Sequence, residues 1–200
     1  MKFRKIASIA MAAALFAFAA CAKNAPQEKI TTEGADMQNK KTAVVYFSVY
    51  EHTKKYAETI QKLTGADILR IETEKPYDSD TSHYEQLAEY AKKERDNDER
   101  PAIKPLDLSK YDTVFVGYPI WLYTLPMPMY TFFDKYDFAG KTIIPFNTHE
   151  GSGDGGTYET IRKFEPEAAV LQGLPIQGES LNKDQTAKIK LWLENLGFRM

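Results

Sequence analysis

The stretch TVFVGYPIWLY, residues 113–123, carries the strongest structural signal in this chain. Its first half, Thr113–Gly117, is short, apolar and rich in β-branched residues, which is typical of a strand buried on both faces. The second half combines glycine, proline and aromatic residues, and this composition indicates a loop. The stretch therefore predicts a buried strand that ends in an aromatic loop.

Similar strand-like runs alternate with amphipathic segments on either side of this stretch. Strands are predicted at residues 42–47, 67–71, 113–117, 141–146 and 168–171. Helices are predicted at residues 53–63, 82–95, 127–133, 157–164 and 183–196. Because parallel strands need crossover connections, the alternation predicts an α/β fold with a parallel sheet covered on both faces.

Three of these helices have an apolar side, which predicts the face that each one buries. In the first helix this face has spacings of three and four and holds Tyr56, Ala57, Ile60 and Leu63. The inner face of the second helix is predicted to hold Tyr84, Leu87, Ala88 and Ala91. The inner face of the last helix is predicted to hold Ile189, Leu191, Trp192 and Leu196.

Ligands of such sheets bind outside the carboxyl ends of the strands, so three loops are candidates for a binding site. The loop Ser48–Lys55 is rich in hydroxyls and leads into a helix, which suits a phosphate group. The loop Gly117–Tyr123 is aromatic. The loop Asn147–Gly156 is rich in glycine, which lets the backbone approach a flat ligand closely.

These loops carry a resemblance to a known family. The motif GYPIW at 117–121, the Pro126-Met127-Pro128 run and the segment FAGKTIIPFNTHEGSG at 138–153 resemble the flavodoxin family. The likeness extends over roughly residues 41–198. It implies a three-layer flavodoxin-like fold, a five-stranded parallel sheet of order 2-1-3-4-5 and bound FMN.

The resemblance also implies where FMN binds. It places the ribityl phosphate at Ser48 to Thr53, and the isoalloxazine between the loop around Trp121 and Tyr123 and the loop Thr148–Gly153. The implied cofactor-binding residues are Ser48, Tyr50, His52, Thr53, Pro119, Ile120, Trp121, Leu122, Tyr123, Thr148, His149, Glu150, Gly151, Ser152 and Gly153. No catalytic residue or metal ligand is predicted, because His149 has no carboxylate or nucleophile partner and Ser152 lacks a G-x-S-x-G elbow.

The first loop departs from the family pattern Ser/Thr-x-Thr-Gly-Asn-Thr. Tyr50, Glu51 and His52 replace the middle threonine, the glycine and the asparagine, whereas Ser48 and Thr53 match. Glu51 brings a negative charge toward the phosphate position, and like charges at ~4 Å repel by about 1 kcal/mol in water and about 4 kcal/mol at an effective dielectric constant of 20.

Two functions therefore stay open. The first is FMN-dependent electron transfer or reduction, either as a one-electron carrier or as a quinone-reductase-like enzyme. The second is a surface lipoprotein of flavodoxin fold that has lost FMN and binds another ligand or a protein partner.

The first twenty residues predict a signal peptide that is separate from the fold. Lys2, Arg4 and Lys5 precede an apolar run, and residues 1–20 contain no acid. Cys21 follows this run and resembles the lipidated cysteine of bacterial lipoproteins, which predicts an exported, membrane-anchored protein facing the periplasm or the cell surface. Plain secretion with Cys21 as a free thiol is the alternative. Residues 22–40 are predicted to be a flexible tether, and residues 41–200 the domain.

The composition excludes other classes. The net charge is -2, with 26 Lys plus Arg against 28 Asp plus Glu, which argues against nucleic acid as a partner. Without the three basic residues of the leader, 23 basic residues remain against 28 acids, or a net charge of -5, which suits a basic redox partner protein. The alternative partner is a small-molecule electron acceptor. Contact with the membrane is expected only through the lipid anchor. The sequence leaves the oligomeric state open.

Overall fold

The computed structural model describes residues 40–178 and 183–199. The predicted signal peptide, Cys21 and all of the predicted tether except Lys40 lie outside these residues. Export, lipidation and the tether therefore stay predictions. Within the described part of the chain, no helix has the length and apolar character needed to cross a bilayer.

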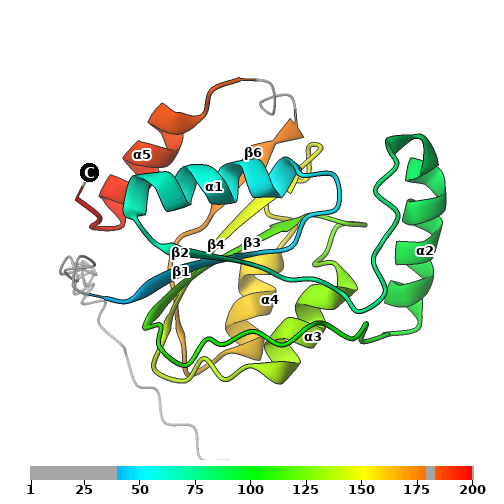
Figure 1. Ribbon diagram of the computed structural model, residues 1–200, viewed down its shortest axis with the longest axis horizontal. Helices are drawn as coiled ribbons and strands as arrows, with labels where there is room; N and C mark the ends of the chain where they lie inside the picture. The colour runs from blue at the N-terminus through cyan, green and yellow to red at the C-terminus, as the bar shows by residue number, and fades with distance from the viewer. Residues whose placement is uncertain (1–39, 179–182, 200) are drawn as a thin grey trace, which may run out of the picture. The chain divides into compact units, whose positions relative to one another are not determined.

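A parallel sheet forms the centre of the domain (Figure 1). Its strands follow the order β2-β1-β3-β4-β5, which confirms the predicted order. The bounds are Thr42–Tyr46 for β1, Asp67–Arg70 for β2, Thr113–Pro119 for β3, Thr142–His149 for β4 and Ala169–Val170 for β5. β1 pairs with both β2 and β3, and the change of direction in strand order lies between β1 and β3, where ligands of such sheets bind.

The edge next to β4 contains one strand more than predicted. β5 pairs with the start of β4, and β6 (Leu174–Gln177) pairs with its end. The Ile143 carbonyl accepts a hydrogen bond from the Leu171 N–H, so Pro145, two residues on, faces the same edge. Because proline has no N–H to donate, the ladder is interrupted there and resumes as β6.

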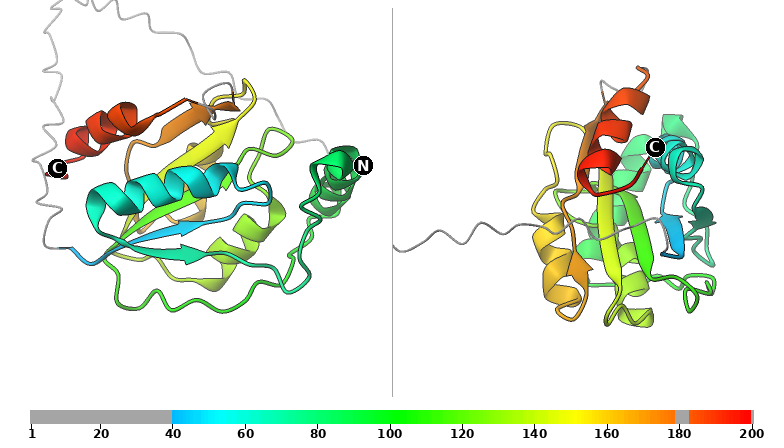
Figure 2. Two further views of the ribbon diagram at one scale, coloured as in Figure 1. Left: turned by 45° about the horizontal axis from the view of Figure 1, so that its top comes forward. Right: turned by 90° about the vertical axis from the view of Figure 1, so that its left-hand side faces the viewer.

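Helices cover the two faces of the sheet in separate pairs (Figures 1 and 2). α1 (His52–Thr64) and α5 (Thr186–Asn195) lie on one face, and α3 (Met127–Lys135) and α4 (Thr157–Phe164) on the other. Side chains of a strand point alternately to the two faces. Val44 and Tyr46 accordingly belong to the core under α1 and α5, and the alternate residues of β1 to the opposite core. This arrangement confirms the three layers.

The helix α2 (Tyr84–Asp96) does not cover the sheet. Together with the short 3-10 helix η2 (Thr81–His83) it stands beyond the carboxyl ends of the strands (Figure 1). The segment 97–112 covers the sheet face instead, with Ile103, Leu108 and Tyr111 buried in the core. The predicted helix is present, but its apolar face is turned toward the loops.

Two expected inner positions are wrong. Tyr84 is 62% exposed on α2, whereas Leu87 and Ala91 are buried. Leu191 is 60% exposed on α5, and Leu193 is fully buried in its place. The reason on α5 is that Ile189, Trp192 and Leu193 share one helical face at spacings of three and four, and Leu191 lies off that face.

Candidate functional site

The first loop, Ser48 to Glu51, connects β1 to α1 and has the geometry of a phosphate cradle. Glu51 is the residue before the helix and has a left-handed backbone, with φ 63° and ψ 2°. This is the conformation that glycine adopts without strain, which explains why the family pattern has glycine at this position. The first N–H groups of α1 have no partner within the helix, and they are the donors that an anion binds.

The Glu51 side chain is paired with two cations. Its carboxylate lies 2.8 Å from Arg70 Nη2 and 2.6 Å from Lys54 Nζ. Burial opposes ionisation of this carboxyl, but the hydrogen bonds and charges of Lys54 and Arg70 leave the pKa of Glu51 lowered. Arg70 Nη2 also donates to the Ser48 carbonyl at 2.6 Å. The carboxylate thus helps to hold the loop, and its charge is compensated within it.

Thr53 links this loop to the loop after β4. Its side chain is buried, and its hydroxyl lies 2.9 Å from the hydroxyl of Thr148. Ser48 is also buried, and no hydrogen bond of its hydroxyl is formed with the described residues. The Thr53 hydroxyl therefore connects the first loop to the loop after β4.

The second loop forms a tight two-residue turn. Trp121 and Thr124 exchange backbone hydrogen bonds of 3.1 and 2.9 Å, and the central residues Leu122 and Tyr123 have φ of 51° and 64°. Two successive left-handed residues define a type I′ turn, which favours asparagine and glycine. Tyr123 is consequently held in the solvent, 80% exposed.

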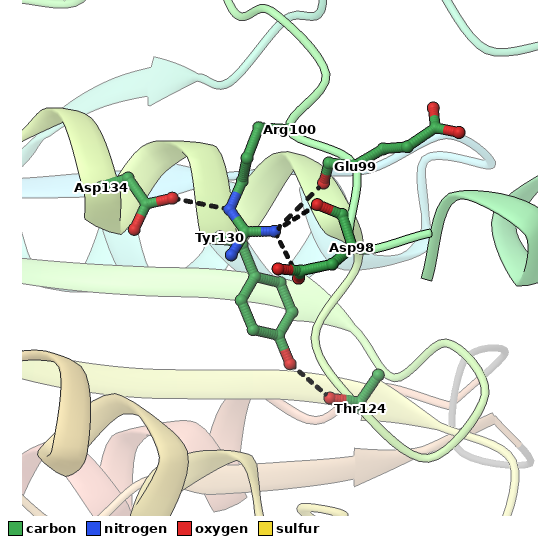
Figure 3. A network of polar contacts seen from close by, with 6 residues as sticks. All are labelled: Asp98, Glu99, Arg100, Thr124, Tyr130 and Asp134. Carbon is green, nitrogen blue, oxygen red and sulfur yellow. Dashed lines mark hydrogen bonds and ion pairs between the residues drawn. The ribbon is translucent and has the colours of Figure 1, made fainter. Parts of the chain in front are cut away.

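A polar network of side chains contacts this turn through Thr124, as Figure 3 shows. Arg100 donates to Asp134 at 2.6 Å and to Asp98 at 2.6 Å, and its guanidinium lies 5.2 Å from the centre of the Tyr130 ring. The Tyr130 hydroxyl lies 2.8 Å from the Thr124 hydroxyl. The network joins the end of α2, the helix α3 and the second loop.

The third loop is organised by His149. Its Nδ1 accepts hydrogen bonds from the N–H of Gly151 at 3.0 Å and of Gly153 at 3.1 Å. Burial lowers the pKa of His149, so the ring is neutral at pH 7 and carries its proton on Nε2. Gly151 and Gly153 have positive φ of 119° and 62°, which the turn requires. His149 therefore acts as a loop-shaping residue.

The three loops meet α2 around a cleft of about 350 Å³. The predicted site residues that line it are Tyr50, His52, Pro119, Ile120, Trp121, Leu122, Thr148, His149 and Glu150. The predicted site residues that do not line it are Ser48, Thr53, Tyr123, Gly151, Ser152 and Gly153. The loops after β1, β3 and β4 thus converge, and only some residues of each loop line the cleft.

One wall of the cleft was missed by the sequence reasoning. It consists of residues from η2 and α2: Thr81, Tyr84, Leu87, Ala88 and Ala91. The spacing of the last four predicts an inner helix face, but it does not specify that this face lines a cleft. The structure shows that this apolar stripe faces a ligand-sized space.

Tyr50 spans the two sides of the cleft. Its ring lies 6.4 Å from the ring of Tyr84 on α2, at an interplanar angle of 33°. Its hydroxyl is buried and has no hydrogen-bond partner among the described residues. The Tyr50 side chain therefore lines the cleft beside α2.

The cleft suits a flat, partly apolar ring with a phosphate-bearing chain. Aromatic and aliphatic side chains surround the ring end, and the start of α1 supplies N–H donors. A larger hollow of about 580 Å³ lies at the opposite edge of the sheet, where it is lined by Lys40, Asp67, Lys110 and neighbouring residues. Among the described residues no group of three His, Cys, Asp or Glu side chains is placed to hold a metal ion.

Comparison with known proteins identifies the family. Residues 41–196 match the flavodoxin family. A curated relative, the NAD(P)H dehydrogenase (quinone) of Gluconacetobacter diazotrophicus, is 27% identical over 150 residues, which cover 68% of this chain and 71% of the relative.

Solved structures agree in fold. A protein assigned as a flavoprotein from Bacteroides eggerthii superposes with a TM-score of 0.70 at 30% identity, covering 80% of this chain and all of the other. A flavoprotein from Lactobacillus acidophilus in complex with FMN superposes with a TM-score of 0.57 at 22% identity, covering 74% of this chain and 97% of the other.

Proposed function

Because the chain belongs to the flavodoxin family, we propose that it binds FMN in this cleft and passes electrons through it. The phosphate binds at the start of α1, whose first N–H groups have no partner within the helix. The isoalloxazine lies between the second and third loops, against Trp121 and Thr148. FMN supplies the one- or two-electron chemistry, and the protein supplies position, exclusion of water and electrostatics.

The observation that carries this proposal is the convergence of the three loops at the switch in strand order. The hydrogen bond between Thr53 and Thr148 joins the phosphate end of the site to the ring end. A ligand that contacts both ends must be elongated, with an anionic group at α1 and a flat group at Trp121. FMN has this shape, and the fold is one in which a solved relative holds FMN.

Glu51 is the feature that favours the alternative, a flavodoxin-fold protein without FMN. The ion pairs of Glu51 with Arg70 and Lys54 weaken that argument, because the carboxylate adds little net charge to the loop. We therefore favour FMN binding over its loss.

The reaction is either electron carriage or flavin-dependent reduction. The relationship to an NAD(P)H dehydrogenase (quinone) supports a reductase that uses a small-molecule acceptor. The exposed Tyr123 beside the cleft and the acidic balance of the chain instead suit docking of a basic redox protein. His149 is engaged through Nδ1 in the loop, so we assign it no proton-transfer role.

Titration with FMN tests the proposal. Purified protein should quench flavin fluorescence at a stoichiometry near one, and the complex should be reduced by NADPH and reoxidised by a quinone if it is a reductase. Reduction by dithionite alone, with no turnover of nicotinamide, would favour the carrier. Absence of quenching at saturating FMN would favour the alternative function.

We further propose that the protein is exported and anchored by a lipid on Cys21. The basic start and the apolar run of residues 1–20 support export, and the position of Cys21 after this run supports lipidation. The variant Cys21→Ser should move the protein from the membrane fraction to the soluble exported fraction. Retention of the variant in the membrane would contradict the anchor.

A further inference from the structure

A buried carboxylate on α2 takes no part in the site described so far. Glu94 is only 2% exposed, and none of the ion pairs formed by the described residues includes it. Its Oε2 accepts a hydrogen bond of 2.7 Å from the Tyr77 hydroxyl. Burial of an unpaired carboxylate is costly, so this position calls for a reason beyond packing.

Tyr77 connects this carboxylate to the opposite wall of the cleft. Its ring packs edge-on against the ring of Trp121, with centroids 5.4 Å apart. Trp121 in turn lies 5.5 Å from the ring of Phe47. Rings in contact at these distances restrict one another's rotation, so fixing Tyr77 also fixes the orientation of Trp121.

The next residue of α2 makes a second connection to the same loop. Arg95 Nη1 donates to the carbonyl of Leu122 at 3.5 Å. Three residues before Glu94, Ala91 lines the cleft together with the rest of the apolar stripe. The end of α2 is therefore attached to the Trp121 loop at two points, while the preceding turns form the cleft wall.

We propose that Glu94 is a positioning residue of the flavin site: through Tyr77 it fixes Trp121 relative to the α2 wall and so keeps the cleft open for a planar ring. The proposal rests on the proposed function for the identity of that ring. It requires a buried acceptor at this position, and an amide oxygen can serve as well as a carboxylate.

The environment of the carboxyl agrees with this role. Desolvation raises the pKa of Glu94 even though the hydroxyls of Tyr77 and Tyr90 act to lower it. The hydrogen bonds from the tyrosines are thus the main interactions that offset the cost of burying the carboxylate. Losing them leaves a buried acceptor without a partner.

Four variants test the proposal in a Trp192→Phe background, in which Trp121 is the remaining tryptophan of the chain. Glu94→Ala removes the acceptor, and Glu94→Gln keeps an oxygen for Tyr77. Tyr77→Phe keeps the ring and removes the donor. Glu89→Ala is the matched control, because Glu89 is an exposed acid on the same helix.

Two readouts are needed, and one of them does not require FMN. We expect Glu94→Ala to raise acrylamide quenching of Trp121 at least twofold in the FMN-free protein. It should also weaken FMN binding about tenfold, the effect of losing a hydrogen bond to a charged group. Glu94→Gln should restore both values to within about threefold, and Glu89→Ala should change neither.

The proposal is overturned if folded Glu94→Ala matches Glu89→Ala in both readouts. If circular dichroism shows that Glu94→Ala does not fold, Tyr77→Phe tests the proposal in its place. Unchanged quenching of Trp121 and unchanged FMN affinity in Tyr77→Phe would overturn the proposal. A rise in both the quenching and the dissociation constant for FMN would support it. If the unaltered protein binds no FMN, the proposed function fails, and the quenching of Trp121 still decides whether Glu94 positions it.

Discussion

At the scale of single residues, Glu51 shows how a substitution against the family pattern is accommodated. The left-handed backbone that glycine would adopt is kept, and the new carboxylate is held by Arg70 and Lys54. These exposed ion pairs add little stability on their own. Their effect is to turn the negative charge toward two cations.

Removing this charge should strengthen FMN binding. In Glu51→Gln the two cations are free to approach the phosphate, so we expect about fivefold tighter binding, equivalent to about 1 kcal/mol. Glu51→Gly should bind FMN at least as tightly and also relieve the left-handed strain. Fluorescence titration measures both, with Glu89→Gln, an exposed acid of α2, as control. Equal affinities for all variants would show that the Glu51 charge lies out of reach of the phosphate.

The His149 ring makes stability depend on pH. Because burial lowers its pKa below the ordinary value of 6.5, the unfolded state binds more protons than the folded state around pH 6. This contribution is fully present above pH 6.5 and is lost as the pH falls through the lowered pKa of the folded protein. Urea unfolding at pH 5.5 and 7.5 should show the loss, and His149→Gln, which cannot titrate, should show a smaller difference. An equal difference would assign the loss to other groups.

At the scale of elements, the turn 121–124 stores strain beside the cleft. Tyr123 has a left-handed backbone although it is not glycine, and its side chain packs on little. Strain of this kind is found at functional sites, where the surrounding structure enforces it. Here the hydrogen bonds of Trp121 and Thr124 and the network around Arg100 enforce it.

Relieving this strain should stabilise the protein. Tyr123→Gly removes the Cβ from a left-handed residue, and we expect a gain of about 0.5–1 kcal/mol in the free energy of unfolding. Tyr123→Ala loses the same ring but keeps the Cβ, so it should give no gain. Urea denaturation of both variants compares them directly. A gain in both would mean that the exposed ring, and not the backbone, is destabilising.

At the scale of the whole molecule, FMN should stabilise the fold because the proposed site is formed by loops that follow three different strands. FMN at 100 times its dissociation constant adds about 2.7 kcal/mol. For a domain of this size that corresponds to a rise of roughly 5–10 °C in Tm. Differential scanning fluorimetry with FMN and with riboflavin measures the effect, and riboflavin, which lacks the phosphate, should give a smaller rise. Equal shifts would mean that the start of α1 does not bind the phosphate.

Much of the fold was predictable because strands and helices leave local patterns. β1, β2 and α4 occur within one residue of their predicted positions. β3 and β4 extend two and three residues further than predicted, to Pro119 and His149. Polar residues such as Asn147 and Thr148 resembled a loop, but pairing with β3 and β6 keeps them in the strand. A local pattern contains no information on such partners.

The candidate site was predictable only in part for the same reason. The three loops were found because parallel strands bring their carboxyl ends to one edge, which topology requires. The α2 wall was missed because the spacing of Leu87 and Ala91 predicts an apolar face without specifying what it faces. The Glu51–Arg70 ion pair was missed because Arg70 is distant in sequence and adjacent only through β1–β2 pairing.

The sequence by itself determined the buried strands, most of the helices, the family and the three loops of the candidate site. Those features depend on the periodicity of neighbouring residues and on short motifs, which are local properties. The tertiary structure alone decided where α2 lies, which way Glu51 points and how Glu94 reaches Trp121 through Tyr77. These depend on contacts between residues far apart in the chain, and such contacts form only when the sheet brings the loops together.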